Sequence, residues 1–183
     1  RSRGLGDVYK RQADDSGITF VGYASGFERQ GAADAEKLEE AVALAKKADT
    51  VLLCLGLDEL RESEGLDRAD MKLAENQQQL LAAVAAVNPN VVVLLSAGAP
   101  VETPWVGQCR ALVYGALGGQ AGAGAAADVL TGKLCPCGKL SQTWAQAHDD
   151  TPAKANFGGE GRNVEYREGL YVGYRYYQTA GVP

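Results

Sequence analysis

Acidic side chains crowd one stretch of the chain, residues 57–74, in which Arg61 and Arg68 are the only arginines. The carboxylates up to position 70 are Asp58, Glu59, Glu62, Glu64, Asp67 and Asp70. Crowded, partly desolvated carboxyl groups keep their protons to higher pH, so one of them can act as a general acid near neutrality. Glu64 is the best candidate, because Gly65 after it allows a sharp turn and the close approach of a ligand. A solvated acidic loop without chemistry is the alternative interpretation.

The position of this stretch supports a functional role. It follows the continuous apolar run Thr50–Leu55, which is typical of a strand that is covered on both faces. Turns from strand to helix in α/β proteins usually have about 2 to 6 residues, and much longer ones are mostly functional or disordered. Open α/β sheets bind their ligands at the carboxyl ends of the strands, where this long connection begins.

Other chemistries fit the sequence less well. A calcium loop with Gly65 at its sixth position would begin at Leu60, where an Asp is needed. Two cysteines one residue apart, Cys135 and Cys137, need further ligands to hold zinc, and neither Cys109 nor His148 has zinc-site spacing. The only histidine has no Ser or Cys motif beside it, so a hydrolase triad is not expected. We therefore predict no metal, no cofactor and free cysteines.

A glycine-rich segment, residues 122–127, is the main competitor, because it satisfies the G-x-G-x-x-A pattern of a dinucleotide site. The first glycine of that fingerprint lies in the turn directly after a strand. Here Gly118 and Gly119 occupy the turn, and Gly122 falls inside the predicted helix. The acidic residue expected about 20 positions later is absent, since the next carboxylates are Asp149 and Asp150. A flavodoxin-like or Rossmann-like nucleotide domain stays open as the alternative function.

Strand-like and helix-like segments alternate around these candidates. Apolar runs predict strands at Ile18–Gly22, Thr50–Leu55, Val91–Ser96 and Ala111–Leu117. Helical periodicity predicts a helix that Asp34 caps, a second one with Leu80, Leu81, Val84 and Val87 on its apolar face, and a third over Gln120–Thr131 that ends at Gly132. This alternation predicts an α/β fold, a three-layer α/β/α sandwich with a mostly parallel, doubly wound sheet.

Composition restricts the classes of function. The chain of 183 residues has room for one domain, and its net charge of −5 argues against binding to nucleic acid or to an anionic membrane. The longest strongly apolar run, Val91–Ala97, is far shorter than the roughly 20 residues of a membrane span. Residues 1–12 are rich in basic side chains, match no targeting signal and are predicted to be a non-native or flexible leader. The localisation is therefore left open.

Beyond Leu134 the sequence changes to turns and aromatic residues. Five of the eight tyrosines of the whole chain lie between positions 166 and 177. We expect this cluster either to cover a surface on further polypeptide or to add a covering strand within the domain.

A series of short motifs, from about Ile18 to the end of the chain, together resembles the C-terminal α/β sandwich domain of glycoside hydrolase family 3, the β-glucosidase and β-xylosidase group. The principal motifs, in order, are TVLLCLG (50–56), SEGLDR (63–68), ENQ (75–77), AGAPV (97–101), GGQAG (118–122), ADVLTG (127–132), GKL (138–140) and YREGLYVGYRYY (166–177). The resemblance implies that residues 13–183 form such a domain, and that its C-terminal edge and the family's catalytic barrel are missing.

The resemblance also implies a mechanism. Family members are retaining β-glycosidases in which a (β/α)8 barrel supplies an Asp nucleophile and the sandwich domain lends a Glu as acid/base. The matching residue is Glu64, with Glu62 as the second choice. Asp67 and Arg68 match the motif too, and we expect them to form an ion pair that braces the loop. The implied partners are a β-linked glucoside or oligosaccharide and the barrel of the same polypeptide, and the chain alone is expected to be inactive.

Overall fold

A parallel sheet of three strands organises the first of two units into which the chain divides. Strands β1 (Val51–Gly56), β2 (Val91–Ser96) and β3 (Ala111–Tyr114) lie in the order β1-β2-β3. This computed structural model describes residues 21–28 and 34–182. The first unit comprises Arg1–Leu66, Leu73–Ala99 and Trp105–Cys137, and the second comprises Asp67–Lys72, Pro100–Pro104 and Gly138–Pro183.

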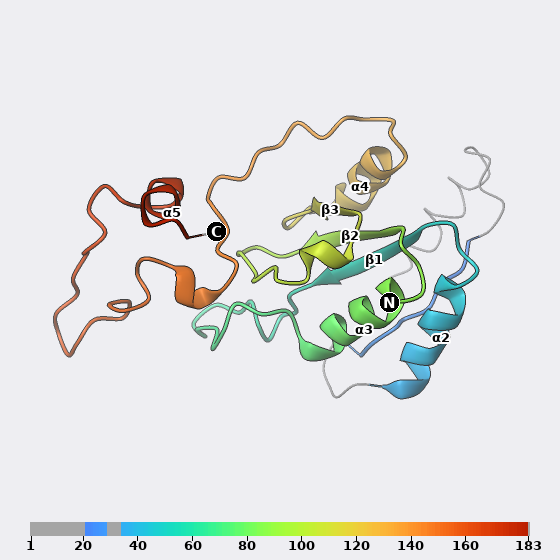
Figure 1. Cartoon of the computed structure of the whole chain (residues 1–183), viewed down its shortest axis with the longest axis horizontal. Coiled ribbons are helices and arrows are strands. Elements are labelled where there is room, and N and C mark those ends of the chain that lie inside the picture. Colours follow the sequence, from blue (N-terminus) through green and yellow to red (C-terminus); the bar gives the residue numbers. More distant parts are fainter. Residues whose placement is uncertain (1–20, 29–33, 183) are drawn as a thin grey trace. The chain divides into compact units, whose positions relative to one another are not determined.

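Helices lie on both sides of the sheet. Helices α2 (Ala35–Ala45) and α3 (Glu75–Ala85) pack against each other on one side, and α4 (Gly122–Leu130) lies on the other (Figure 1). The predicted α/β fold with a parallel sheet and flanking helices is thus confirmed. The predicted cap of α2 is confirmed as well, because Asp34 accepts hydrogen bonds from the backbone N–H groups of Glu36 and Lys37.

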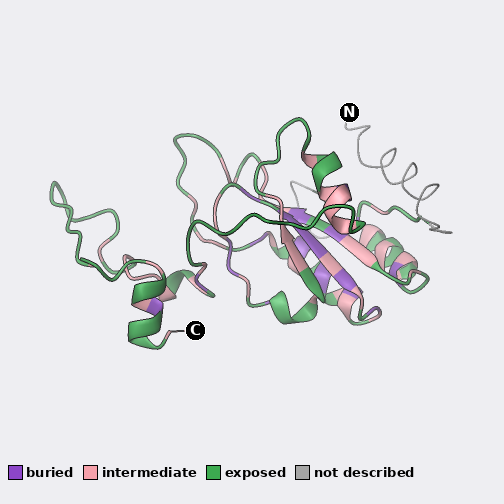
Figure 2. Cartoon of the chain, turned by 90° about the horizontal axis from the view of Figure 1, so that it is seen from above, coloured by how far each residue is buried: buried purple, intermediate pink, exposed green. Residues whose placement is uncertain are grey.

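The core of this unit follows the apolar runs of the sequence. The central strand β2 is the most deeply buried, with Val91, Val93 and Leu95 fully inaccessible to solvent. From α3, Leu81 and Val84 pack into the same core, and Figure 2 shows the buried residues concentrated along the strands. Each such aliphatic side chain stabilises the fold by about 1.5–3 kcal/mol.

Two strand predictions need correction. The third strand ends at Tyr114 and not at Leu117, because Ala116 has a positive φ of 48° that a strand cannot continue through. Of the predicted strand Ile18–Gly22, the first three residues lie outside the described part, and Val21 and Gly22 are not in a strand. Gly132 ends the third predicted helix with a φ of 75°, as expected.

The second unit contains one short α-helix, α5 (Tyr174–Ala180), and a 3₁₀ turn, η2 (His148–Asp150). The tyrosine cluster forms no covering strand in the described part of this unit. Tyr177 is buried, whereas Tyr166 is 88% exposed. A buried carboxylate that the sequence analysis missed, Glu102, accepts a hydrogen bond from the backbone N–H of His148 and so fixes the start of η2.

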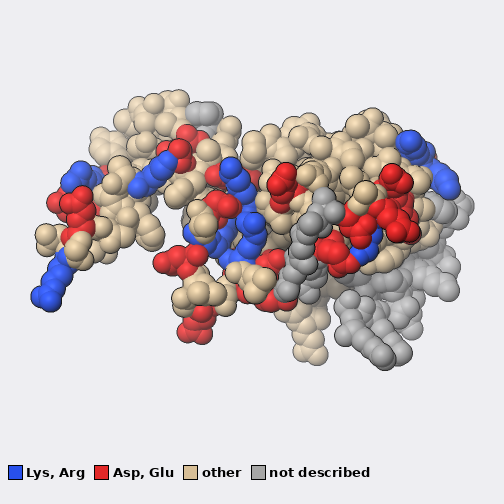
Figure 3. All heavy atoms as spheres, turned by 90° about the horizontal axis from the view of Figure 1, so that it is seen from below, with Lys and Arg blue, Asp and Glu red and all other residues tan. Residues whose placement is uncertain are grey.

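Among the residues described, no helix has the length and hydropathy to cross a membrane. Asp and Glu side chains are intermingled with Lys and Arg on the face of the molecule in Figure 3.

Candidate active-site loop

The acidic loop leaves β1 at a point that a buried glutamine fixes. Gln77 of α3, only 4% exposed, accepts a hydrogen bond from the N–H of Gly56 at 2.9 Å and donates one to its carbonyl oxygen at 2.8 Å. The next N–H, of Leu57, donates to the carbonyl of Ser96 in β2. The start of the loop is therefore held from two sides, by α3 and by the neighbouring strand.

The first turn of the loop is built on Asp58. Its Oδ1 accepts hydrogen bonds from the N–H groups of Leu60 and Arg61, at 3.1 and 3.0 Å. Its carbonyl oxygen accepts from the N–H groups of Arg61 and Glu62. An Asp side chain that bonds to the backbone two or three residues later is a common way to fix a turn. Asp58 therefore has a structural role, and the turn delivers the chain to Glu62 in a defined direction.

Glu62 reaches across to the loop that follows β2. Both of its carboxylate oxygens lie 2.9 Å from the backbone nitrogen of Gly98, and the side chain is half-buried. The residue before Gly98 is held as well, because the hydroxyl of Tyr114, at the end of β3, donates to the carbonyl of Ala97 at 2.7 Å. The segments at the carboxyl ends of all three strands are thus linked by hydrogen bonds.

Glu64 occupies the next turn and is exposed to solvent. The N–H of Leu66 donates to the carbonyl of Ser63, and Gly65 has a φ of 77°, so Glu64 and Gly65 are the central residues of a β-turn. In the described part of the chain, Glu64 has no hydrogen-bond or ion-pair partner. Of the two candidate carboxylates, Glu62 is engaged with the backbone and Glu64 is available.

Asp67 and Arg68 belong to the second unit, and the expected ion pair between them is not formed. Arg68 instead donates from Nη1 to the carbonyl of Pro100, at 3.1 Å, and its Nε and Nη2 are buried without a hydrogen-bond partner. Asp67 is exposed. Arg68 therefore braces its segment through the backbone carbonyl of Pro100.

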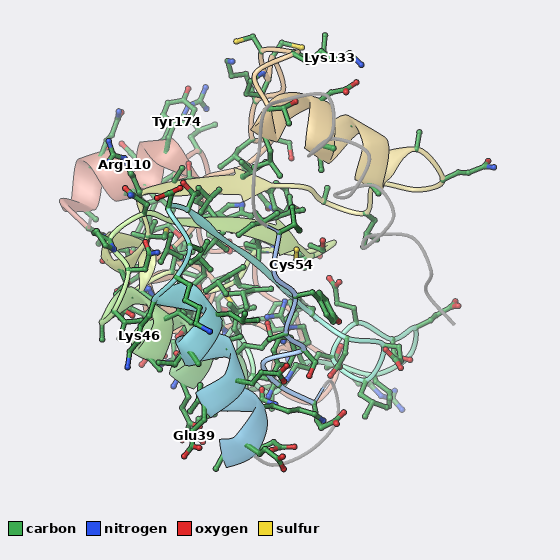
Figure 4. All side chains as sticks on the ribbon, turned by 90° about the vertical axis from the view of Figure 1, so that its right-hand side faces the viewer. Glu39, Lys46, Cys54, Arg110, Lys133 and Tyr174 are labelled. Carbon is green, nitrogen blue, oxygen red and sulfur yellow. The ribbon has the colours of Figure 1, made fainter. Side chains whose placement is uncertain are left out.

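The other candidates from the sequence were the glycine-rich segment at α4 and the cysteines. Helix α4 begins at Gly122, while the tight turn before it contains Gly118, where an added Cβ would lie 2.9 Å from the Cα of Gly122. The four cysteines form no disulfide, and Cys54 on β1 is exposed (Figure 4). No group of three or more His, Cys, Asp or Glu residues in ranges 21–28 and 34–182 is arranged to hold a metal ion.

Glu64 does not line either of two hollows, one in each unit. The second unit has a cavity of about 350 Å³ lined by Pro152, Arg167, Glu168, Tyr171, Tyr176, Thr179 and Ala180. The first unit has a groove of about 510 Å³ between α2 and α3, lined mostly by apolar side chains. Glu64 lines neither of these two hollows and lies on the exposed turn of its loop.

Comparison with known proteins gives one consistent family. The chain is 42% identical over 181 residues to the thermostable β-glucosidase B of Acetivibrio thermocellus, covering 97% of this chain and 24% of that protein. It is 45% identical over 150 residues to an exo-α-(1→6)-L-arabinopyranosidase of Bifidobacterium breve, covering 81% of this chain and 20% of that protein. The chain thus spans about a quarter or less of the length of these relatives.

Solved structures agree with this assignment. The crystal structure of a family 3 β-glucosidase of Bifidobacterium adolescentis superposes with a TM-score of 0.87 at 44% identity, over 96% of this chain and 26% of that one. A β-glucosidase of Kluyveromyces marxianus in complex with glucose gives a TM-score of 0.78 at 40% identity, over 84% and 18% of the two chains. The family model described as the glycosyl hydrolase family 3 C-terminal domain matches residues 6–174, and the chain belongs to this family.

Proposed function

We propose that this chain is the part of a retaining β-glycosidase that supplies the general acid/base, and that Glu64 is that residue. The observation that carries the proposal is the contrast within the loop. Glu62 is bound to a backbone N–H, while Glu64 is exposed and without a partner among the described residues. A group that must reach a sugar held by another domain has to project from its own domain in this way.

The chemistry needs a second carboxylate that this chain does not supply. In the first step, the nucleophile of a (β/α)8 barrel domain attacks the anomeric carbon, and Glu64 gives its proton to the glycosidic oxygen as the carbon–oxygen bond breaks. In the second step, the Glu64 carboxylate takes a proton from a water molecule whose oxygen displaces the nucleophile. The two carboxyl groups of a retaining enzyme lie about 5–5.5 Å apart, so the barrel must approach the turn that carries Glu64 closely.

The position of the loop supports this role. It begins at the carboxyl end of β1, the end at which open parallel sheets bind their ligands. The turn that carries Glu64 is exposed, as a surface that faces another domain must be before that domain is present. No metal or organic cofactor is part of the proposed reaction, because two carboxyl groups and a water molecule complete both steps.

The proposed substrates are β-linked glucosides or oligosaccharides. The names of the relatives include both β-glucosidase and exo-α-(1→6)-L-arabinopyranosidase, so the assay compares aryl β-D-glucosides, β-D-xylosides and α-L-arabinopyranosides. We expect hydrolysis of the β-D-glucoside to be the most efficient by kcat/KM in the complete enzyme. A higher kcat/KM for the arabinopyranoside would contradict the proposed sugar and leave the role of Glu64 unaffected.

The decisive experiment replaces the acid/base in the complete enzyme. We expect Glu64→Ala to lower kcat by a factor of about 10²–10⁴ for substrates with poor leaving groups. For aryl glucosides with good leaving groups, which need no acid in the first step, azide should restore turnover by replacing water as the second nucleophile. The matched control is Glu59→Gln, which removes another exposed carboxylate of the same loop. Unchanged activity of Glu64→Ala would make the loop structural, and micromolar binding of NAD or FMN would favour the nucleotide alternative at Gly122.

A further inference from the structure

The contact between Glu62 and Gly98 joins two loops that are 36 residues apart in the sequence. Glu62 lies in the acidic loop after β1, and Gly98 lies just after β2. Both carboxylate oxygens are 2.9 Å from the same backbone nitrogen, so the N–H is shared between them. Hydrogen bonds from a backbone N–H to an ionised carboxylate are stronger than neutral ones, and this one is exposed to solvent.

The glycine at position 98 makes this contact possible. A Cβ added there would lie 3.1 Å from Oε1 of Glu62 and 3.0 Å from Cδ1 of Leu117. Such distances are tighter than ordinary van der Waals contact, so a side chain at this position would require Glu62 or Leu117 to shift by a few tenths of an ångström. The carboxylate of Glu62 thus lies close against the backbone of Gly98.

Glu62 is separated from Glu64 by one residue. The Asp58 turn fixes the chain before Glu62, and the turn Ser63–Leu66 begins directly after it. Among the residues that the structure describes, no hydrogen bond links residues 63–66 to any other part of the first unit. The Gly98 contact is thus the last anchor before the turn that carries Glu64.

We propose that Glu62 is a positioning residue, which clamps the loop to Gly98 and so sets the place of Glu64 in the active site. This inference rests on the proposed function of Glu64. A misplacement of about 1 Å of a catalytic group can lower the rate about 100-fold, because the reacting atoms no longer meet at the required distance. Loss of the clamp therefore reduces proton transfer while the sugar, which other residues hold, still binds.

The test compares Glu62→Ala with Glu62→Gln in the complete enzyme. The alanine variant loses the clamp, and we expect kcat for aryl glucosides with poor leaving groups to fall by about 10²-fold while KM changes little. The basic limb of its pH profile should also move, because this limb reports the acid of the reaction. Glutamine keeps an acceptor oxygen for the N–H of Gly98 and should retain most of the activity. Glu59→Gln is the control for the loss of a negative charge.

A direct measurement of the clamp accompanies the kinetics. Amide hydrogen exchange at Gly98 should be faster in Glu62→Ala than in the wild type, and close to wild type in Glu62→Gln. If the alanine variant does not fold, Glu62→Asp serves instead, since its side chain is one methylene shorter and keeps the charge. Unchanged exchange at Gly98, or a glutamine variant as impaired as the alanine variant, would overturn the positioning role.

The remaining outcomes separate this inference from the proposed function. If only the positioning role is wrong, Glu64→Ala loses activity while Glu62→Ala matches the Glu59→Gln control. If azide rescues Glu62→Ala and not Glu64→Ala, Glu62 is itself the acid/base, and the positioning role is wrong. If Glu64→Ala keeps full activity, the proposed function fails and there is no catalytic side chain for Glu62 to position.

Discussion

The buried amide of Gln77 offers the most direct test of how the loop is held in place. Its two hydrogen bonds, of 2.9 and 2.8 Å, satisfy both backbone groups of Gly56, the last residue of β1. Replacement by leucine keeps a side chain of similar size and removes both bonds. A buried backbone group left without a partner costs about 1–3 kcal/mol. Gly56 is half-buried, so water reaches it in part, and the cost for each of its two backbone groups lies near the lower end of that range, about 1 kcal/mol.

We therefore expect Gln77→Leu to lower the free energy of unfolding by about 2 kcal/mol. For a chain of this length the melting temperature should fall by about 4–8 °C. Urea unfolding followed by circular dichroism measures the change through the midpoint at constant m-value. The control is Gln79→Leu, at an exposed position of the same helix, with an expected effect within about 0.5 kcal/mol. Equal effects of the two substitutions would refute the structural role of the Gln77 amide.

Two further predictions concern the sheet and the cysteines. Gly56→Ala should destabilise the fold by about 2–3 kcal/mol or prevent folding, because the new Cβ would lie 2.1 Å from the backbone oxygen of Ser96, whereas Gly107→Ala meets no atom within 4 Å. Urea unfolding compares the two variants, and similar midpoints would contradict the packing argument. Burial raises the pKa of the Cys109 thiol, so at pH 8 this residue should react with an alkylating reagent more slowly than the exposed Cys135. Mass spectrometry of the peptides measures both rates, and equal rates would show that burial does not protect Cys109.

The regular elements of the first unit could be predicted because their signals are local. Apolar runs identified β1 and β2, and the Asp34 cap identified the start of α2. The end of β3 could not be predicted, since Ala116 is compatible with a strand by residue type and departs from it only through its positive φ. The tyrosine cluster also gave no usable signal, because aromatic residues favour strands and buried helices alike.

Gln77 was missed although the sequence contains a signal for it. It lies three and four positions before Leu80 and Leu81 and seven before Val84, so it is on the apolar face of α3. A polar side chain in such a row is either an exception to the pattern or a buried group with fixed partners. Its partner, Gly56, is 21 residues away, and only the folded chain shows that the two meet.

The choice between Glu62 and Glu64 shows most clearly what the sequence leaves open. The two residues have the same side chain, lie two positions apart and flank Ser63, and the glycine after Glu64 is the local feature that favours it over Glu62. The fold separates them through Gly98, whose backbone N–H donates to the carboxylate of Glu62. Once Glu62 is bound there, the turn at Gly65 directs the next carboxylate outward. In the roles that we propose, Glu62 anchors the loop at Gly98 and Glu64 is the carboxyl group presented to a sugar.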